Sequence, residues 1–227
     1  TMFRVPVEKH GVNGHLRQKG KIAELALGYQ GGTGALKAMG ADKMGLTDDE
    51  LQDIVTKWRN ASPHIVRFWY DVDAAAKRAI QEPGKMVILR NIKFYALYGA
   101  LFIELPSGRR LAYIHPSIGT NRFGSESIVH KGVGLNNKWE DLETYGGKLV
   151  ENIVQATARD CLSAAMMRLA KAGYKIIMHV HDEVVMEMPI GKGSLNEVTR
   201  IMSINEPWER GLIKNADGFE SNYYMKD

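Results

Sequence analysis

One long amphipathic pattern, from about Leu142 to Lys171, constrains the fold of this 227-residue chain more than any other feature. Its apolar residues recur at the spacing of one helix face, and Gly173 follows as a C-terminal stop. A helix of this length needs a partner layer to cover its apolar face. The residues of that face include Leu149, Val150, Ile153, Cys161, Leu162, Met166 and Leu169.

The first half of the chain is predicted to be mostly helical. One helix is expected from about Leu16 to Tyr29, where a glycine-rich stretch ends it, and a second from the Thr47–Glu50 capping box to about Asn60. Ser62 and Pro63 begin a third helix, which Pro83-Gly84 stops. Its apolar face comprises Ile65, Phe68, Trp69, Val72, Ala76 and Ala79.

The second half mixes strands and helices. Residues 87–116 are β-rich with a turn at Pro106-Ser107-Gly108, and residues 119–138 predict loops with short strands. A capping box at Ser194 predicts a helix to about Ile204, and the tail from Trp208 to Asp227 is expected to be strand and coil that closes the sheet. The pattern predicts an α+β fold with a boundary between residues 120 and 140.

Composition fits a soluble globular protein: 44% of residues are hydrophobic and 25% are charged. No stretch approaches the roughly 20 apolar residues that span a bilayer, so no membrane partner is expected. The lone cysteine, Cys161, cannot form an internal disulfide, and we expect a cytoplasmic protein. The net charge of +4 is compatible with a nucleic-acid partner without requiring one.

A candidate anion site lies on the first helix, where Arg17, Lys21, Leu25 and Tyr29 are spaced four residues apart. This spacing places them along one slowly drifting stripe. Like charges at i and i+4 cost a helix roughly 0.2–0.5 kcal/mol, which Glu24 can offset through Lys21, and a bound triphosphate would explain them better. The alternative is a solvated basic face with Leu25 and Tyr29 buried.

A candidate metal site is His181-Asp182-Glu183, which separates two apolar β-rich runs, Lys175–Val180 and Val184–Met188. The runs predict a hairpin with the trio at its tip. Adjacent carboxylates repel each other, and Mg²⁺ relieves that repulsion while taking its other ligands from phosphates and water. Two alternatives stay open: a plain polar turn, and a zinc hydrolase site in which a strand points His179 and His181 to one face beside Asp182.

Four segments together resemble the family A DNA polymerases, the polymerase I group, and most closely their phage-type branch. LRQKGKIAELALGYQGG resembles motif B on the fingers helix, and HVHDEVVMEMP resembles motif C in the palm. LPSGRRLAYIHP is similar to the Gly-Arg-Arg segment between these motifs, and ENIVQATARD to a palm helix whose Gln contacts the duplex. The resemblance implies a right-hand polymerase, with fingers at residues 1–130 and part of an antiparallel-sheet palm at residues 131–227.

The resemblance also implies roles for single residues. Arg17 and Lys21 would grip the triphosphate of a dNTP, with Lys21 and Asp182 as the catalytic pair. Asp182 would bind the catalytic Mg²⁺, with Glu183 as a second carboxylate. The partners would be template–primer DNA and dNTPs. Other contacts would come from Leu25 and Tyr29 in the nascent base-pair pocket, His181 at the primer terminus and Gln155 at the minor groove.

The sequence departs from the family pattern in three places. Leu25 stands where Phe or Tyr often governs sugar selection, and Gln30 where a Gly often follows the Tyr. The motif A aspartate, needed for two-metal phosphoryl transfer, has no counterpart before Arg17, where Glu8 is the only acid. We therefore expect the chain alone to be an inactive fragment that needs motif A and a thumb from a longer polymerase. The alternative is a non-catalytic nucleic-acid-binding or nucleotide-binding module.

Overall fold

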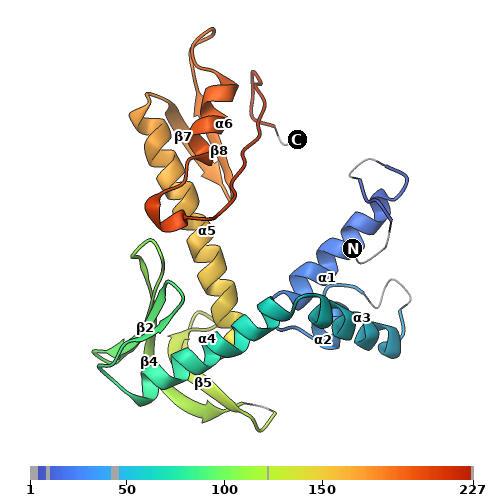
Figure 1. Cartoon of the computed structure of the whole chain (residues 1–227), viewed down its shortest axis with the longest axis vertical. Coiled ribbons are helices and arrows are strands. Elements are labelled where there is room, and N and C mark those ends of the chain that lie inside the picture. Colours follow the sequence, from blue (N-terminus) through green and yellow to red (C-terminus); the bar gives the residue numbers. More distant parts are fainter. Residues whose placement is uncertain (1–4, 9–10, 42–45, 122, 226–227) are drawn as a thin grey trace. The chain divides into compact units, whose positions relative to one another are not determined.

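The chain has an α+β fold, as predicted, and the computed structural model describes residues 5–8, 11–41, 46–121 and 123–225 (Figure 1). It divides into two compact units. Unit 1 comprises Thr1–Ile103 and Arg110–Asn152, and unit 2 comprises Glu104–Arg109 and Ile153–Asp227. Within the long helix the division falls between residues 152 and 153. The assignment of residues 1–130 to fingers and 131–227 to palm stays a prediction.

Unit 1 begins with four helices: α1 Gly14–Leu27, α2 Thr33–Ala38, α3 Asp48–Ala61 and α4 Pro63–Gln81. The glycine-rich stretch after α1 does more than end it, because α2 starts there. Gly31 makes this close return possible, since a Cβ at residue 31 would lie 2.0 Å from the carbonyl oxygen of Ala26. The buried side chains between these helices include Leu27, Leu36, Leu51, Val55 and Trp69.

Local signals set the ends of α3 and α4. The predicted capping box is present: Thr47 Oγ1 accepts from the Glu50 amide, and Glu50 accepts from the Thr47 amide at 2.8 Å. Pro63 occupies the start of α4, as predicted. The apolar face of α4 was predicted less well, because Ile65 is 40% exposed. The buried residues of α4 are Trp69, Val72, Ala75, Ala76 and Ala79.

A six-stranded antiparallel sheet completes unit 1, and its strands follow one another in sequence order. α4 packs on β1, β2 and β4 (Figure 1). Residues 119–138, predicted as loops with short strands, contain the end of β4, loops on either side of β5, and β5 itself, whose eight residues make it longer than predicted. The strands are β1 Val87–Leu89, β2 Ile92–Leu97, β3 Ala100–Glu104, β4 Arg110–Thr120, β5 Glu126–Val133 and β6 Trp139–Thr144.

The long helix, α5, spans Gly146–Lys171. It was predicted to start at Leu142, but Leu142 pairs with His130 in the sheet, so β6 takes the residues that continue the helical pattern. No helix in the described part of the chain is long and apolar enough to cross a membrane.

Unit 2 packs the predicted hairpin, β7 Lys175–Val180 and β8 Glu183–Glu187, with α6 Leu195–Ser203 and the end of α5. Its core contains Leu169, Tyr174, Val198 and Ile201. The capping box at Ser194 forms only in part. Ser194 Oγ accepts from the Glu197 amide, but the Glu197 carboxylate accepts from the Tyr174 hydroxyl at 2.7 Å.

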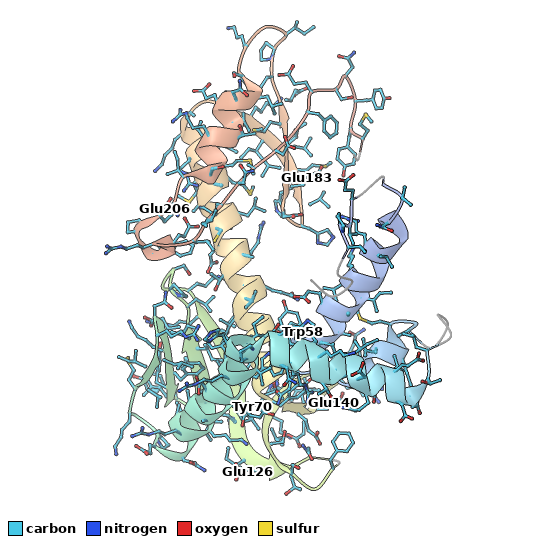
Figure 2. The ribbon with its side chains drawn as sticks, turned by 45° about the vertical axis from the view of Figure 1, so that its right-hand side comes forward. Trp58, Tyr70, Glu126, Glu140, Glu183 and Glu206 are labelled. Carbon is cyan, nitrogen blue, oxygen red and sulfur yellow. The ribbon has the colours of Figure 1, made fainter. Side chains whose placement is uncertain are left out.

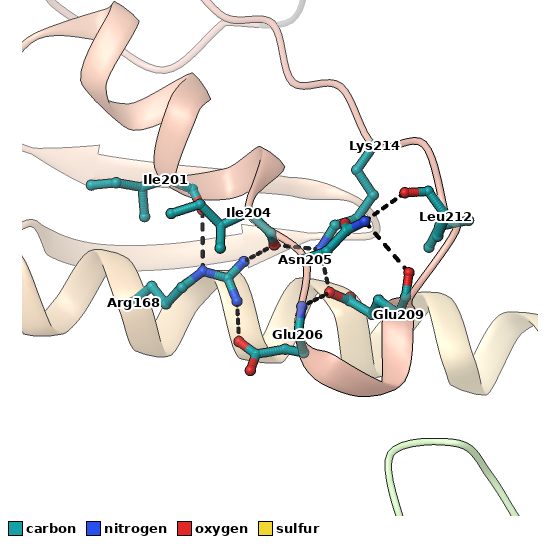
Figure 3. A network of polar contacts seen from close by, with 8 residues as sticks. All are labelled: Arg168, Ile201, Ile204, Asn205, Glu206, Glu209, Leu212 and Lys214. Carbon is teal, nitrogen blue, oxygen red and sulfur yellow. Dashed lines mark hydrogen bonds and ion pairs between the residues drawn. The ribbon is translucent and has the colours of Figure 1, made fainter.

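The tail after α6 is not the predicted strand: the described residues form a 3₁₀ helix at Pro207–Glu209 and then irregular chain. A polar network holds it (Figure 3). Arg168 donates to the carbonyls of Ile201 and Ile204, at 3.1 and 2.9 Å, and also pairs with Glu206. Lys214 binds the buried Glu209 carboxylate at 2.7 Å. These bonds fix the start of the tail against α5 and α6 without a sheet partner.

Candidate functional site

The predicted phosphate stripe lies on the exposed side of α1. Arg17 and Lys21 are exposed and Leu25 is 48% exposed, whereas Ala23, Ala26 and Leu27 are buried. The alternative, a solvated basic face with Leu25 and Tyr29 buried, is therefore wrong for Leu25, although the basic residues are exposed as it requires. Tyr29 lies just beyond the helix end and is half-buried. The stripe thus offers two accessible cations followed by an accessible apolar side chain and an aromatic ring.

Glu24 does not support Lys21 as the sequence suggested. Its carboxylate accepts a hydrogen bond from the indole Nε1 of Trp58 on α3, at 2.6 Å. The Trp58 and Trp69 rings are stacked, with their centroids 5.9 Å apart, so this contact joins α1 to both α3 and α4. The hydrogen bond from Trp58 to Glu24 anchors α1, and the described residues show no ion pair between Glu24 and Lys21.

The backbone just after α1 is held at three points. Trp69 Nε1 donates to the Gly28 carbonyl at 2.9 Å, and Arg59 Nη2 donates to the Gly31 carbonyl at 3.2 Å. Between them, Gln30 Oε1 accepts from the Gly147 amide at 2.8 Å. We call these three hydrogen bonds the α1 clamp. Sequence reasoning missed the clamp; the one available signal was Gln30, which departs from the family pattern.

The second part of the candidate site is the tip of the β7–β8 hairpin. Val180 pairs with Glu183, which leaves His181 and Asp182 as a two-residue turn. Asp182 is exposed, and Glu183 is half-buried. Figure 2 labels Glu183, which begins β8. The described residues contain no cluster of three His, Cys, Asp or Glu side chains that could hold a metal ion. The hairpin tip has two neighbouring carboxylates, Asp182 and Glu183. A Mg²⁺ ion that also binds phosphate takes one or two carboxylates from protein.

His181 has a strained backbone. Its φ of 52° lies in the left-handed region, where a residue with a Cβ is disfavoured and glycine is common in two-residue hairpin turns. Such outliers persist where surrounding structure enforces them, and they concentrate at functional sites. The strained backbone makes the side chain of His181 a candidate for a functional contact.

The hairpin does not provide the paired histidines that the zinc alternative requires. β7 ends at Val180, so the alternation of side chains along the strand does not extend to His181. Both ring nitrogens of His179 lie close to the Arg159 guanidinium, at 3.3 and 3.1 Å. A neighbouring cation opposes binding of a second positive charge at His179.

The Gly-Arg-Arg segment joins the middle of α5. The Asp160 carboxylate, which is buried, accepts from Arg109 Nε and from Ser107 Oγ, each at 2.5 Å. Arg109 Nη2 also donates to the Ala156 carbonyl at 2.6 Å. Gln155, the predicted duplex reader, is exposed beside this junction. The sequence singled out both segments without indicating that they bind each other.

The predicted residues thus form two groups, one in each unit. Arg17, Lys21, Leu25 and Tyr29 belong to unit 1 and lie along or just after one helix. Gln155, His181, Asp182 and Glu183 belong to unit 2, on α5 and the hairpin tip. The first group contains the exposed cations Arg17 and Lys21, and the second contains the exposed Asp182 and the half-buried Glu183; the roles predicted for them stay predictions.

Comparison with known proteins gives one informative match. No family model matches the chain, and no solved structure matches it. The chain is 54% identical, over all of its 227 residues, to a protein of Bacillus phage SP02 named DNA polymerase. It spans 35% of the length of that protein.

Proposed function

We propose that this chain is part of a family A DNA polymerase of the phage type, holding the fingers and the C-terminal part of the palm. The observation that carries the proposal is 54% identity over the whole chain to a phage DNA polymerase. The independent resemblance of four segments to family motifs, in the family's order, supports the same assignment.

In the proposed reaction the primer 3′ hydroxyl attacks the α-phosphorus of a dNTP, the bond to the β-phosphate oxygen breaks, and pyrophosphate leaves. Arg17 and Lys21 bind the triphosphate and stabilise the charge that develops on the leaving pyrophosphate. Their exposure on one helix face, with Glu24 turned to Trp58, supports this role. Tyr29 lines the base-pair pocket, and Leu25 lies between it and Lys21.

In unit 2, Asp182 and Glu183 would hold Mg²⁺ through carboxylate oxygens, and the ion would neutralise phosphate charge and lower the pKa of the attacking hydroxyl. His181 contacts the primer terminus, and Gln155 reads the minor-groove edge, where its amide can donate or accept. The accessible position of Asp182 in a two-residue turn supports the metal role, because an ion held there can also be reached by a substrate phosphate.

Primer extension by the full-length natural protein that contains this sequence tests the proposal. Incorporation of dNTPs with Mg²⁺ is expected, and Asp182→Ala should lower it by about 10³-fold or more. Asp217→Ala, which removes an exposed carboxylate of the tail, is the matched control and should leave extension unchanged. Absence of templated incorporation, or equal rates for Asp182→Ala and the control, would overturn the proposal.

Primer–template binding separates polymerase activity from binding alone. Binding should weaken steeply as salt rises, because phosphate contacts release counterions. Steep salt dependence without any Asp182-dependent incorporation would favour the non-catalytic nucleic-acid-binding module over the polymerase.

A further inference from the structure

Gln30 has an unfavourable backbone conformation for its residue type. Its φ of 71° lies in the left-handed region, where glycine is the usual residue and a side chain with a Cβ is disfavoured. Nothing in the turn after α1 requires a Cβ at this position. A long amide side chain in such a place indicates that the side chain makes a contact that offsets the strain.

That contact is with the first turn of α5. The backbone amides in the first turn of a helix have no partner within the helix. Gly147 is the second residue of α5, and its amide donates to Gln30 Oε1 at 2.8 Å. Gln30 therefore caps a helix that starts more than a hundred residues later in the chain.

The two backbones also touch directly at this point. A Cβ at Gly147 would lie 2.3 Å from the Tyr29 carbonyl oxygen and 2.4 Å from the Gln30 Cβ. A Cβ at Gly146 would lie 2.1 Å from the carbonyl oxygen of Trp69. Gly147 therefore fits closely against Tyr29 and Gln30, and Gly146 fits against the main chain of Trp69. The hydrogen bond from Gly147 to Gln30 fixes the first of these contacts.

The other two hydrogen bonds of the α1 clamp hold the chain before and after Tyr29. Trp69 donates to the Gly28 carbonyl, and Arg59 donates to the Gly31 carbonyl. In the third bond the side chain of Gln30 accepts from α5. The backbone of Tyr29 is consequently fixed relative to α4 and α5, so its ring can move only by rotation about the side-chain bonds.

We propose that Gln30 is a positioning residue that sets nucleotide selection: by capping α5 it fixes Tyr29 at the base-pair pocket. This inference rests on the proposed function, since it assumes that Tyr29 lines that pocket. Without the cap, Tyr29 shifts more easily, and correct and incorrect base pairs are accepted more equally. In this role Gln30 acts through the backbone of Tyr29 and not on the substrate itself.

Three variants of the full-length protein test this role. Gln30→Ala removes the acceptor and keeps the strained backbone, whereas Gln30→Gly removes both, so a loss shared by the two comes from the missing acceptor and not from backbone strain. Gln30→Glu keeps an acceptor oxygen, whose charge also suits a helix N-terminus. Gln52→Ala removes an exposed glutamine of α3, bonded to Thr56, and is the matched control.

Single-nucleotide incorporation of a matched and a mismatched dNTP gives the main readout. Gln30→Ala and Gln30→Gly should lower the ratio of matched to mismatched kcat/KM by about 2- to 10-fold, the range for one lost hydrogen bond. The loss should appear mainly as a higher KM for the matched dNTP. Gln30→Glu and Gln52→Ala should keep the wild-type ratio. Hydrogen exchange of residues 145–149 should be faster in the Ala and Gly variants alone.

The outcomes separate the two proposals. Wild-type selectivity in Gln30→Ala and Gln30→Gly, with Asp182-dependent extension intact, would overturn the role of Gln30 and leave the polymerase assignment standing. Equal losses in Gln30→Glu and Gln30→Ala would also overturn it, because the acceptor is retained in the first. Absence of Asp182-dependent extension in the wild type would overturn the polymerase assignment and this role with it.

Discussion

Arg109 and Asp160 form a direct ion pair that binds the β3–β4 turn to the middle of α5, with Arg109 Nε 2.5 Å from Asp160 Oδ1. The side chain of Asp160 is only 10% exposed, and its second oxygen accepts from Ser107. A carboxylate removed from water in this way depends on its partners, because desolvation without pairing is costly.

Removing the cation should destabilise unit 2 more than the loss of an ordinary ion pair. Arg109→Ala leaves the buried Asp160 carboxylate with one hydroxyl partner, Ser107. The free energy of unfolding should fall by about 1–3 kcal/mol. This loss is smaller than for a fully buried pair, because Arg109 is half exposed. Arg67→Ala, which breaks the exposed α4 pair with Asp71, should cost about 0–0.5 kcal/mol. Urea denaturation of each variant measures the difference; equal effects would contradict the buried-pair account.

Cys161 should remain a protonated, unreactive thiol in the folded protein. Burial, together with the neighbouring Glu209 carboxylate, raises the pKa of Cys161 to about 12 from an ordinary 9.0. The thiolate is the reactive form, so thiol reagents at pH 8 should modify Cys161 slowly until the protein unfolds. Modification at the same rate in native and urea-unfolded protein would contradict this.

The same shift predicts a dependence of stability on pH. Because the folded pKa of Cys161 is raised, its contribution is complete below the unfolded pKa of 9.0 and is lost as pH rises toward about 12. The unfolding midpoint of the wild type should therefore fall more between pH 9 and 10.5 than that of Cys161→Ser. Parallel profiles for the two proteins would rule out the titration of Cys161 as the cause.

Gly147→Ala should disturb the contact between α5 and Tyr29 by changing the α5 partner instead of Gln30. The added Cβ would meet main-chain oxygen at 2.3 Å, so either α5 or the turn after α1 must move. We expect a loss of about 1–3 kcal/mol in the free energy of unfolding, as for overpacking. Gly34→Ala in α2, where no atom lies within 4 Å of the new Cβ, should be neutral or stabilising by up to about 1 kcal/mol. Thermal or urea unfolding distinguishes the two.

Local signals predicted the elements that depend on local chemistry. The capping box at Thr47, proline at the start of α4 and the β7–β8 hairpin are all confirmed. The errors occurred where distant partners decide. Leu142 continues the helical pattern of α5, yet it joins β6 because His130 lies opposite it in the sheet. The tail after α6 stays irregular because Arg168 and Lys214 bind its backbone and side chains.

The candidate site shows the same limit. The types of residue at Arg17, Lys21 and Asp182 indicated phosphate and metal chemistry, and all three side chains are exposed. Their roles stay predictions. The supporting contacts could not be predicted, because the hydrogen bond from Gly147 to Gln30 joins positions 117 residues apart. No local sequence pattern indicates such a contact. The one sign of it in the sequence was Gln30, at a position where the family resemblance leads one to expect glycine.

Lys21→Ala tests the phosphate role on α1. Loss of a cation that stabilises the leaving pyrophosphate should lower kcat/KM for dNTP by about 10²–10³-fold. Folding should be nearly unaffected, because the side chain is exposed. Lys57→Ala, an exposed lysine of α3 paired with Asp53, is the control and should retain wild-type kinetics. Equal kinetics in both variants would remove Lys21 from the site.

His181→Gly should make the hairpin more stable and the enzyme less active. Glycine relieves the left-handed backbone, which should add about 1 kcal/mol to the free energy of unfolding. The same change deletes the imidazole proposed to contact the primer terminus, so extension should slow even though the fold gains stability. Asn137→Gly, at φ 55° in another turn, should raise stability less, because asparagine tolerates this region, and should leave extension unchanged. Urea unfolding measures the stability of His181→Gly, and primer extension measures its rate; the first should rise while the second falls. A variant that gains stability and keeps full activity would show that the strained His181 serves no function at the primer end.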